Sequence, residues 1–338
     1  MRVQLTKNVA DFLQSPVHHF IGGQFKTSAT SATGQVLNPS DGSVLATVAM
    51  GGAAEVDEAV AAAWKAFPAW SALSPNERAA KLHRFAEQLE KHTADLALIE
   101  SLDVGKAITA AEGFDVPFGI EALRYFANLS THAHYDTPLA IKNIEARTHR
   151  APYGVCGFVF PWNFPFTLLL WGIAPALAAG NTVVVKPSEV TPLSSIFAAK
   201  LAAEAGIPDG VAVAALKETK TGPGPARETQ MGPLVSETQR RRIIRYLENG
   251  VKAGAQAILP GGASTPRGYE GGFYVQPSLL ASSPDNVCCR KEIFGPSAFL
   301  LKFKDEAGAV SLVNQLAYGL ANSVWSSDLK RAGRSPSK

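Results

Sequence analysis

The stretch FPWNFPF (residues 160–166) joins a continuous apolar run to a segment with helical character. An amide side chain at a strand-to-helix turn lies beside unpaired backbone N–H groups and the positive end of the helix dipole. Asn163 is therefore a candidate donor for stabilising a developing oxyanion. The alternative is that Asn163 only caps the following helix, and residue types alone favour that simpler role.

A second polar cluster lies in VVVKPSE (183–189), where another apolar run ends. Ligands of open α/β sheets bind at the carboxyl ends of the strands. Lys186 and Glu189 are therefore candidates for holding ribose hydroxyls, with Ser188 beside them. An ordinary solvent-exposed strand end is the alternative.

The third candidate stretch is CCRKEIFGP (288–296), in which Glu292 stands two residues before Phe294 and ahead of a Gly-Pro turn. A carboxylate next to an aromatic ring can bind a ribose and support a flat heterocycle. A salt bridge and a core phenylalanine are the alternatives, and they are favoured if this motif is taken by itself.

Composition predicts a soluble globular protein of about two domains. Hydrophobic residues make up 46% of the 338 and charged residues 18%, which excludes a disordered chain. The net charge is +3, and the longest basic block is Arg240-Arg241-Arg242. We expect this triplet on a solvated helix face, so nucleic acid is not an expected partner.

Cysteine usage favours a reducing compartment. Cys156, Cys288 and Cys289 form an odd set without metal-ligand spacing, and the adjacent pair cannot readily bridge to each other. The N-terminal stretch lacks the apolar core of a secretory signal, and no run approaches the roughly 18 apolar residues of a membrane span. We therefore expect a cytoplasmic protein with no membrane or metal partner.

Periodicity predicts an α/β fold from residue 154 onward. GVCGFVF, TVVVKP and VAVAAL are typical of buried parallel strands, and two helical segments separate them, the second with Thr191 as its expected cap. Strand–helix–strand–helix–strand is half of a doubly wound nucleotide-binding sheet. Upstream, residues 20–50 predict short antiparallel strands, and Ser74 with Glu77 forms a capping box that starts a helix.

The ordered motifs together resemble the NAD(P)-dependent aldehyde dehydrogenase superfamily. The resemblance rests on FPWNFPF, WGIAPALAAGNTVVVKPSEVTPLSS, AGIPDGV, ETQMGPLVS and KEIFGP, and it is supported by FIGGQF, NPSDGSVLATV and LAYGLANSVWSSDLKRA. It covers roughly 17–211 and 220–332. The resemblance implies NAD(P)-dependent oxidation of an aldehyde to a carboxylic acid through a cysteine thiohemiacetal.

The resemblance also implies roles for individual residues. Asn163 matches the oxyanion-stabilising amide, and Lys186, Ser188 and Glu189 match the segment at the adenosine ribose. Glu292 matches the carboxylate at the nicotinamide ribose, with Phe294 beside the nicotinamide. The wall of the cofactor cleft is matched by Phe160, Pro161 and Trp162.

The resemblance implies three structural parts. These are a Rossmann-like cofactor domain over 1–137 and 153–215, part of a β oligomerisation arm over 138–152, and an incomplete α/β catalytic domain over 216–338. A homo-oligomer and a small aldehyde substrate are the implied partners. Glu189 disfavours a 2′-phosphate, which favours NAD over NADP.

Three motifs of the family are missing from the sequence. There is no Glu-Leu-Gly-Gly segment for the glutamate base, no Gly-Gln-x-Cys-like context for the nucleophile, and no Gly-Ser-Thr loop near the pyrophosphate. The join is expected within VAVAALKETK (211–220), because the following loop resembles the family's catalytic domain. RAGRSPSK at the end of the sequence also departs from the family pattern.

Three hypotheses follow from this pattern. The chain is a shortened product or gene-model fragment of an aldehyde dehydrogenase, a non-catalytic cofactor-binding or oligomer-forming partner, or a chain that does not fold stably because sheet edges are exposed. The intact motifs favour the first. As written, the chain is expected to be inactive.

Overall fold

The structure is a computed structural model that describes residues 4–14, 17–28, 32–214, 229, 231–264, 266, 268–320, 323–324 and 328. The chain divides into two compact units. Unit 1 comprises Met1–Glu237 and Thr265–Tyr274, and unit 2 comprises Thr238–Ser264 and Val275–Lys338. Most of the expected join at 211–220, and most of the loop after it, lies outside the described residues.

A five-stranded sheet forms the centre of unit 1. Its order is β2-β1-β9-β8-β7, where β7 (Val155–Val159), β8 (Thr182–Lys186) and β9 (Ala212–Ala214) are parallel. The hairpin of β1 (His19–Ile21) and β2 (Gln24–Lys26) adds antiparallel to β9. The order β9-β8-β7 is the 3-2-1 half of a doubly wound sheet, so the α/β prediction is confirmed.

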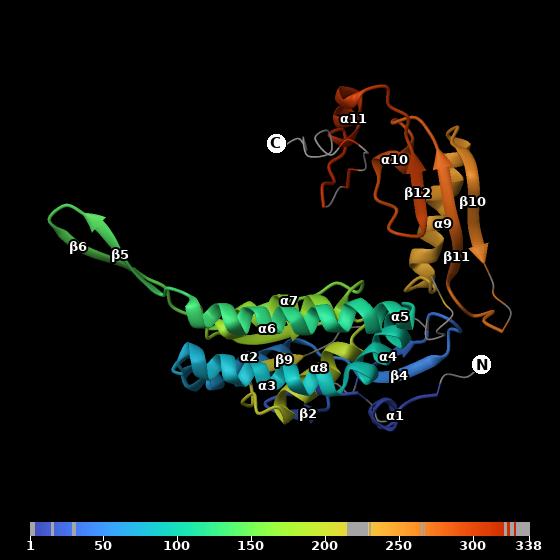
Figure 1. The fold of residues 1–338 in the computed structure, drawn as a ribbon. Coiled ribbons are helices and arrows are strands. Elements are labelled where there is room, and N and C mark those ends of the chain that lie inside the picture. Colours follow the sequence, from blue (N-terminus) through green and yellow to red (C-terminus); the bar gives the residue numbers. More distant parts are fainter. Residues whose placement is uncertain are drawn as a thin grey trace. The chain divides into compact units, whose positions relative to one another are not determined.

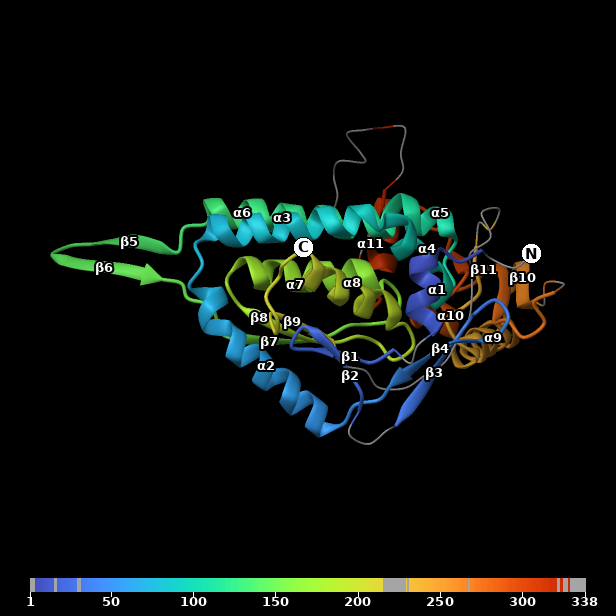
Figure 2. The same ribbon diagram turned by 90° about the horizontal axis from the view of Figure 1, so that it is seen from below.

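Figure 1 labels the elements, and Figure 2 shows that helices cover both faces of this sheet. On one face lie α7 (Pro165–Ala178) and α8 (Leu193–Glu204), with α3 (Pro75–Lys91) and α6 (Val116–His132) in a further layer. The other face is covered by α2 (Ala53–Ser71). The helix α4 (Thr93–Val104) packs against α8. Smaller helical elements of this unit are α1 (Lys7–Gln14), α5 (Ile108–Ala110) and a π-helical turn, Ala111–Asp115.

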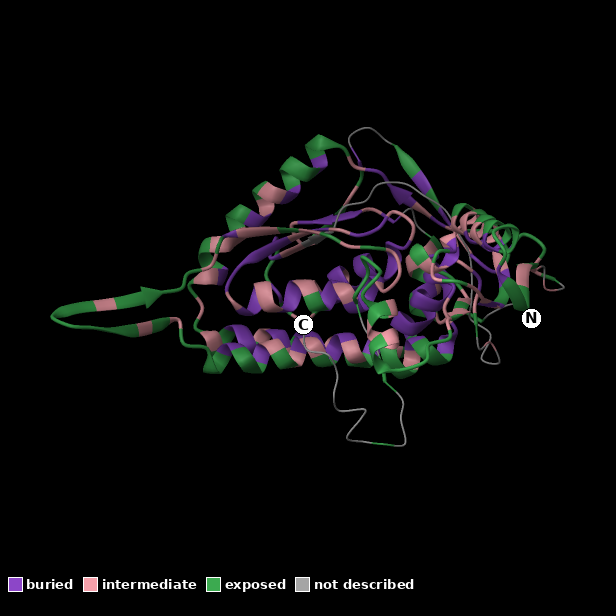
Figure 3. Ribbon diagram, turned by 90° about the horizontal axis from the view of Figure 1, so that it is seen from above, coloured by how far each residue is buried: buried purple, intermediate pink, exposed green. Residues whose placement is uncertain are grey.

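The capping box predicted at Ser74 is present. Ser74 Oγ accepts a hydrogen bond from the Glu77 backbone N–H, and the Glu77 carboxylate accepts one from Ser74 N–H at 2.7 Å. In contrast, Thr191 does not cap α8 as expected, because the N-cap position is Pro192 and the Thr191 hydroxyl donates elsewhere. The buried core of unit 1 is formed by residues of the sheet and of the helices packed against it, and Figure 3 colours the buried residues purple.

Two hairpins complete unit 1. One consists of β3 (Thr33–Leu37) and β4 (Val44–Ala49), which pair antiparallel within the region predicted to hold short strands. The other consists of β5 (Asp136–Ile141) and β6 (Ile144–His149), and it projects from the rest of the unit with most of its residues exposed (Figure 3).

Unit 2 is built around a three-stranded sheet of order β10-β11-β12. Its strands are β10 (Gln256–Ser264), β11 (Tyr274–Ala281) and β12 (Ser297–Leu300), and β11 pairs parallel with β12. In the described part of this unit, the strands are accompanied by the helices α9 (Glu237–Lys252), α10 (Val287–Arg290) and α11 (Glu306–Val313).

Strand β7 is the last strand of its sheet among the described residues. In a 3-2-1-4 sheet the first strand is central, and the fourth strand pairs with its outer side. The sequence of β7, VCGFV, carries no charge or proline, and Val159 is 76% exposed. An uncharged edge of this kind is a template for pairing with another chain.

We expect Val159→Lys to reduce self-association, because an edge lysine opposes strand pairing between molecules. The measurement is sedimentation velocity over a range of protein concentrations. The matched control is Val56→Lys, since Val56 is 50% exposed on helix α2, which has no strand edge. Equal effects of the two substitutions would show that added charge, rather than the β7 edge, controls self-association.

Candidate active site

The parallel pairing of β7 and β8 brings two of the candidate motifs together. Val159 is the register partner of Lys186, and the Phe160 N–H donates to the Lys186 carbonyl at 3.1 Å. The turns that follow both strands are joined directly, because the Thr191 hydroxyl donates to the Trp162 carbonyl at 3.1 Å. The residues of FPWN and KPSE therefore share one edge of the sheet, at the carboxyl ends of its parallel strands.

Lys186 and Glu189 form an ion pair at this edge, with 2.9 Å between Nζ and Oε2. The Lys186 ammonium also donates to the Pro187 carbonyl at 3.1 Å. Both side chains are about one-third exposed, and Ser188 between them is buried. The pair presents a cation and a carboxylate next to each other at the end of the second parallel strand, where an acidic residue binds ribose hydroxyls in dinucleotide-binding sheets.

Asn163 does not cap α7. The N-cap position is Phe164, which makes no side-chain capping bond, and Pro165 occupies the first helical turn. The half-buried Asn163 side chain makes no hydrogen bond within the described part of the chain. The simpler role that residue types favoured is therefore wrong, and the amide remains available to a ligand.

Aromatic packing fixes the wall beside these turns. The Phe160 ring stacks on Phe158 with centroids 5.6 Å apart and an interplanar angle of 5°. Gly172 of α7 permits this packing, because a Cβ at that position would lie 2.5 Å from Phe160 Cζ. Trp162 is half-buried and Pro161 is exposed.

Glu292 and Phe294 lie in unit 2, in the segment before β12. This segment is held by α9: Gln239 Nε2 donates to the Phe294 carbonyl at 2.7 Å, and Arg242 Nη2 donates to the Glu292 carbonyl at 2.8 Å. The φ of Phe294 is 58°, which is strained for a bulky residue and is a feature that clusters at functional sites. Glu292 and Phe294 are both exposed, so Phe294 is not a core residue.

The structure corrects the expectation for the basic triplet. Arg242 is not simply solvated, because its guanidinium binds the backbone of Glu292 and Ile293 and lies over the Tyr246 ring at 5.2 Å. The helical pattern of the sequence places Arg242 on a face of α9, but it carries no signal for a partner 50 residues away in the chain.

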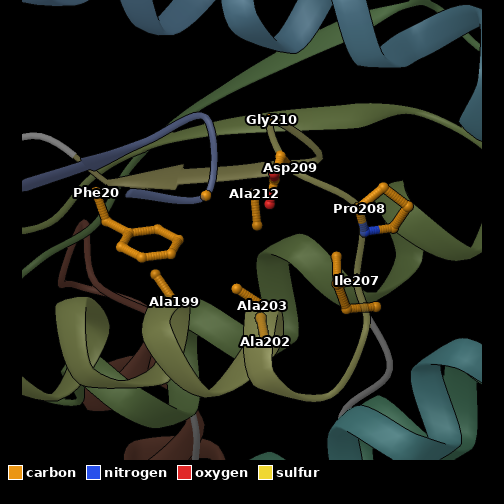
Figure 4. Close-up of a pocket in the computed structure, with 10 residues that line it drawn as sticks. Phe20, Ala199, Ala202, Ala203, Ile207, Pro208, Asp209, Gly210 and Ala212 are labelled. Carbon is orange, nitrogen blue, oxygen red and sulfur yellow. The ribbon is translucent and has the colours of Figure 1, made fainter. Parts of the chain in front are cut away.

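Neither of two cavities in unit 1 can hold a dinucleotide. One, shown in Figure 4, has a volume of about 10 Å³ and lies between α8 and the β1 and β9 strands. The other has a volume of about 20 Å³ and lies between α7, α8 and the sheet. Volumes of this size correspond to about one water molecule. None of the candidate residues lines either cavity.

The three cysteines are all free, and burial raises the pKa of each thiol. Cys288 is buried, and its Sγ lies 3.0 Å from the Tyr246 carbonyl. A thiol nucleophile needs the opposite shift, towards the thiolate. None of these thiols has the environment of an activated nucleophile.

A buried acidic group behind the turns was not identified from the sequence. Glu100 and Asp103 of α4 are fully buried, and Asp115 lies close to Lys106, whose Nζ is 2.9 Å from Asp115 Oδ2. Burial raises the pKa of Glu100 to about 7, against the opposing effect of Lys106. The sequence signal that could have identified them is the presence of two acids, Glu100 and Asp103, within a mostly apolar helical segment.

A comparison with known protein families agrees with the parallel sheet and with the motifs at its strand ends. A sequence model described as "Aldehyde dehydrogenase family" matches residues 25–214 and 212–337. The two matches together span most of the chain, and they meet at the end of β9. This is the place where the sequence motifs predict the join.

Alignments with relatives are longer than this chain. An aldehyde dehydrogenase of Emericella nidulans is 31% identical over 427 residues, covering 95% of this chain and 85% of the relative. A 2-hydroxymuconic semialdehyde dehydrogenase of Pseudomonas is 30% identical over 430 residues, covering 94% and 88%. Both alignments are much longer than this chain of 338 residues, so part of each relative has no counterpart here.

Solved structures share the fold. The NAD+ complex of an aldehyde dehydrogenase from Bacillus cereus has a TM-score of 0.90 at 27% identity, covering 98% of this chain and 88% of that one. The structure of another relative, HpcC from Thermus thermophilus, has the same TM-score at 27% identity, with 96% and 84% covered. The sequence, the parallel sheet and these matches together place the chain in the aldehyde dehydrogenase family.

Proposed function

We propose that this chain retains the adenosine side of an NAD site, at the carboxyl ends of β7 and β8, but does not complete aldehyde oxidation. The observation that carries the first part is the Lys186–Glu189 pair at the end of the second parallel strand. An acidic residue at this position binds the ribose hydroxyls of NAD and repels the 2′-phosphate of NADP. Ser188 and the wall of Phe160, Pro161 and Trp162 would contact the cofactor from the adjoining turns.

The residues at the turn after β7 fit the other part of the family's chemistry. The Asn163 amide makes no hydrogen bond within the described residues and lies just before the N-terminus of α7, so it would donate to a developing oxyanion. When bound, the nicotinamide accepts a hydride. Glu292 and Phe294 are the proposed contacts to the ribose and ring of that half of the cofactor.

The proposal that the chain does not oxidise aldehydes rests on the state of its three thiols and on the missing family motifs. The family's cysteine and glutamate segments are missing from the sequence, and Cys156, Cys288 and Cys289 all have a pKa raised by burial. Without a thiolate, no thiohemiacetal forms on the protein. The parent substrate is an aldehyde, but this chain does not turn it over.

We further propose a cytoplasmic location and a homo-oligomer for this chain. None of the described helices is both long and apolar enough to cross a bilayer. The three free cysteines favour a reducing, cytoplasmic environment. The projecting β5–β6 hairpin is the proposed oligomerisation arm, and its partner would be a second copy of the chain.

We expect the purified chain to form no NADH from a panel of aliphatic and aromatic aldehydes, because the nucleophile and the base are missing. NADH absorbance measures the reaction, and a full-length relative serves as the positive control. The parallel assay of Cys289→Ala decides how any activity arises. Turnover that this substitution abolishes would mean that the thiol has been relocated, and the proposal of inactivity would be wrong.

We expect Lys186→Ala to weaken NAD binding about tenfold, the effect of losing one charge-assisted hydrogen bond. Isothermal titration calorimetry with NAD measures the affinity. The matched control is Lys200→Ala, because Lys200 also forms a lysine–glutamate pair, with Glu204 on the exposed face of α8. An equal loss in both variants would rule out a specific role for Lys186 at the cofactor.

A further inference from the structure

The helix α4 is buried around its whole circumference along its last ten residues, Asp95–Val104. A helix buried on all sides normally carries apolar residues throughout. This helix carries Glu100 and Asp103 at positions with no exposed surface. Burying two carboxyl groups is costly unless hydrogen bonds satisfy them, so their contacts indicate what they do.

Both carboxyl groups bind the beginnings of helices that follow the candidate turns. Glu100 Oε1 accepts hydrogen bonds from the Phe166 backbone N–H at 2.9 Å and from the Ser194 hydroxyl at 2.6 Å. Asp103 Oδ2 accepts one from the Leu193 backbone N–H at 2.8 Å. Phe166 lies in the first turn of α7, and Leu193 and Ser194 lie in the first turn of α8.

Neither helix has a side-chain cap of its own. The N-cap residues are Phe164 in α7 and Pro192 in α8, and neither makes a capping bond. The first N–H groups of a helix need acceptors, and a nearby carboxylate also interacts favourably with the positive end of the dipole. Glu100, which belongs to α4, therefore accepts hydrogen bonds from the first turn of α7 and from the first turn of α8 at the same time.

The two helix starts are the ends of the two turns that carry the candidate cofactor residues. Asn163 precedes Phe166 by three residues, and Glu189 precedes Leu193 by four. A single carboxyl group that holds both helix starts fixes the spacing between the turns. The bond from Thr191 to the Trp162 carbonyl joins the same two turns from the other side.

The charged groups around Glu100 are few. Lys106 Nζ lies 4.0 Å from Glu100 Oε2 and over the Phe164 ring at 3.7 Å. Asp115 pairs with that ammonium, and Asp103 faces Glu100 from the same helix. Glu100 Oε2 has no hydrogen-bond partner among the described residues, so it can carry a proton while Oε1 keeps both of its donors.

We propose that Glu100 is a positioning residue, which aligns the Asn163 turn with the Lys186–Glu189 turn by holding the N-termini of α7 and α8. The role rests on the proposed cofactor site at these turns. Asp103 acts with Glu100 through the first N–H of α8.

The test compares Glu100→Ala with Glu100→Gln in the full chain. The alanine variant loses the shared acceptor, so we expect NAD affinity to fall about tenfold, as for the loss of one buried hydrogen bond. The glutamine variant keeps an oxygen for the Phe166 N–H and the Ser194 hydroxyl, so we expect it to restore most of the affinity. Calorimetry with NAD measures both.

The matched control is Asp95→Ala. Asp95 is a buried acid of the same helix, but it accepts hydrogen bonds from Asn8 at 2.9 Å and from Thr6, far in sequence from either turn. This variant should lose stability without losing NAD affinity. Equal affinity losses in the Asp95 and Glu100 alanine variants would overturn the proposal, because both would then act through general stability.

Amide hydrogen exchange separates this inference from the proposed function. If the wild-type chain does not bind NAD, the cofactor proposal is wrong, and exchange still tests the positioning role. We expect the protection factor of the Phe166 amide to fall about tenfold in Glu100→Ala and to stay unchanged in Asp95→Ala. Unchanged protection in Glu100→Ala would refute the positioning role.

If Glu100→Ala does not fold, Ser194→Ala provides the second variant, because it removes one donor to Glu100. It should lower NAD affinity or Phe166 protection by a smaller factor. No change in either would refute the positioning role.

The pH dependence of stability gives a further check on the charge of Glu100. Burial raises the pKa of Glu100 from 4.5 to about 7, so the folded state binds a proton more tightly than the unfolded state. The stability that Glu100 contributes is therefore lost as the pH rises from about 4.5 to about 7. We expect the melting temperature of the wild type, relative to Glu100→Gln, to fall across this interval. A constant difference would show that Glu100 does not titrate in the folded chain.

Discussion

The candidate site depends on one interaction, the parallel pairing of β7 with β8. Because parallel strands end at the same edge, this pairing brings the residues after Val159 next to those after Lys186. Neither turn can form a nucleotide site by itself. The hydrogen bonds between the strands set the register, and the contacts from α4 hold the helices that leave both turns.

The same sheet indicates where a fourth strand of a doubly wound fold would pair. A doubly wound sheet binds its ligand at the crevice between the first and fourth strands, where the strand order reverses. Here β7 is the last strand of its sheet among the described residues, so of such a crevice only the wall formed by β7 is described. The family match is divided at the end of β9, which is the point in the chain where a fourth strand would follow. The uncharged edge of β7 and the absence of the family's cysteine and glutamate motifs from the sequence both agree with a division of the family match at this point.

The polar groups inside unit 1 follow from this architecture. Helices α7 and α8 begin at the edge of the sheet with uncapped N–H groups that face the interior. Phe166 and Leu193 are fully buried, so their N–H groups need acceptors from another element. Glu100 and Asp103 provide them, and the cost of burying their carboxyl groups is offset by hydrogen bonds to backbone and hydroxyl donors.

Most of the secondary structure of unit 1 could be predicted from the sequence, because local patterns carry it. The apolar runs of β7 and β8 and the Ser74–Glu77 capping box depend on neighbours within a few residues. The predicted cap at Thr191 was wrong, since the Thr191 hydroxyl bonds to the Trp162 carbonyl in the other turn. That competition is between segments far apart in the chain, and residue types do not reveal it.

The sequence by itself determined the α/β class, the motifs of the aldehyde dehydrogenase family and the residue types at the strand ends. The order of residues also shows that the family's Glu-Leu-Gly-Gly and Gly-Gln-x-Cys-like motifs do not occur in it. Only the tertiary structure decided that Asn163 does not cap α7, that Arg242 holds the Glu292 segment and that Glu100 joins two helix starts. Each of these depends on contacts between residues far apart in the chain, and such contacts exist only once the chain has folded.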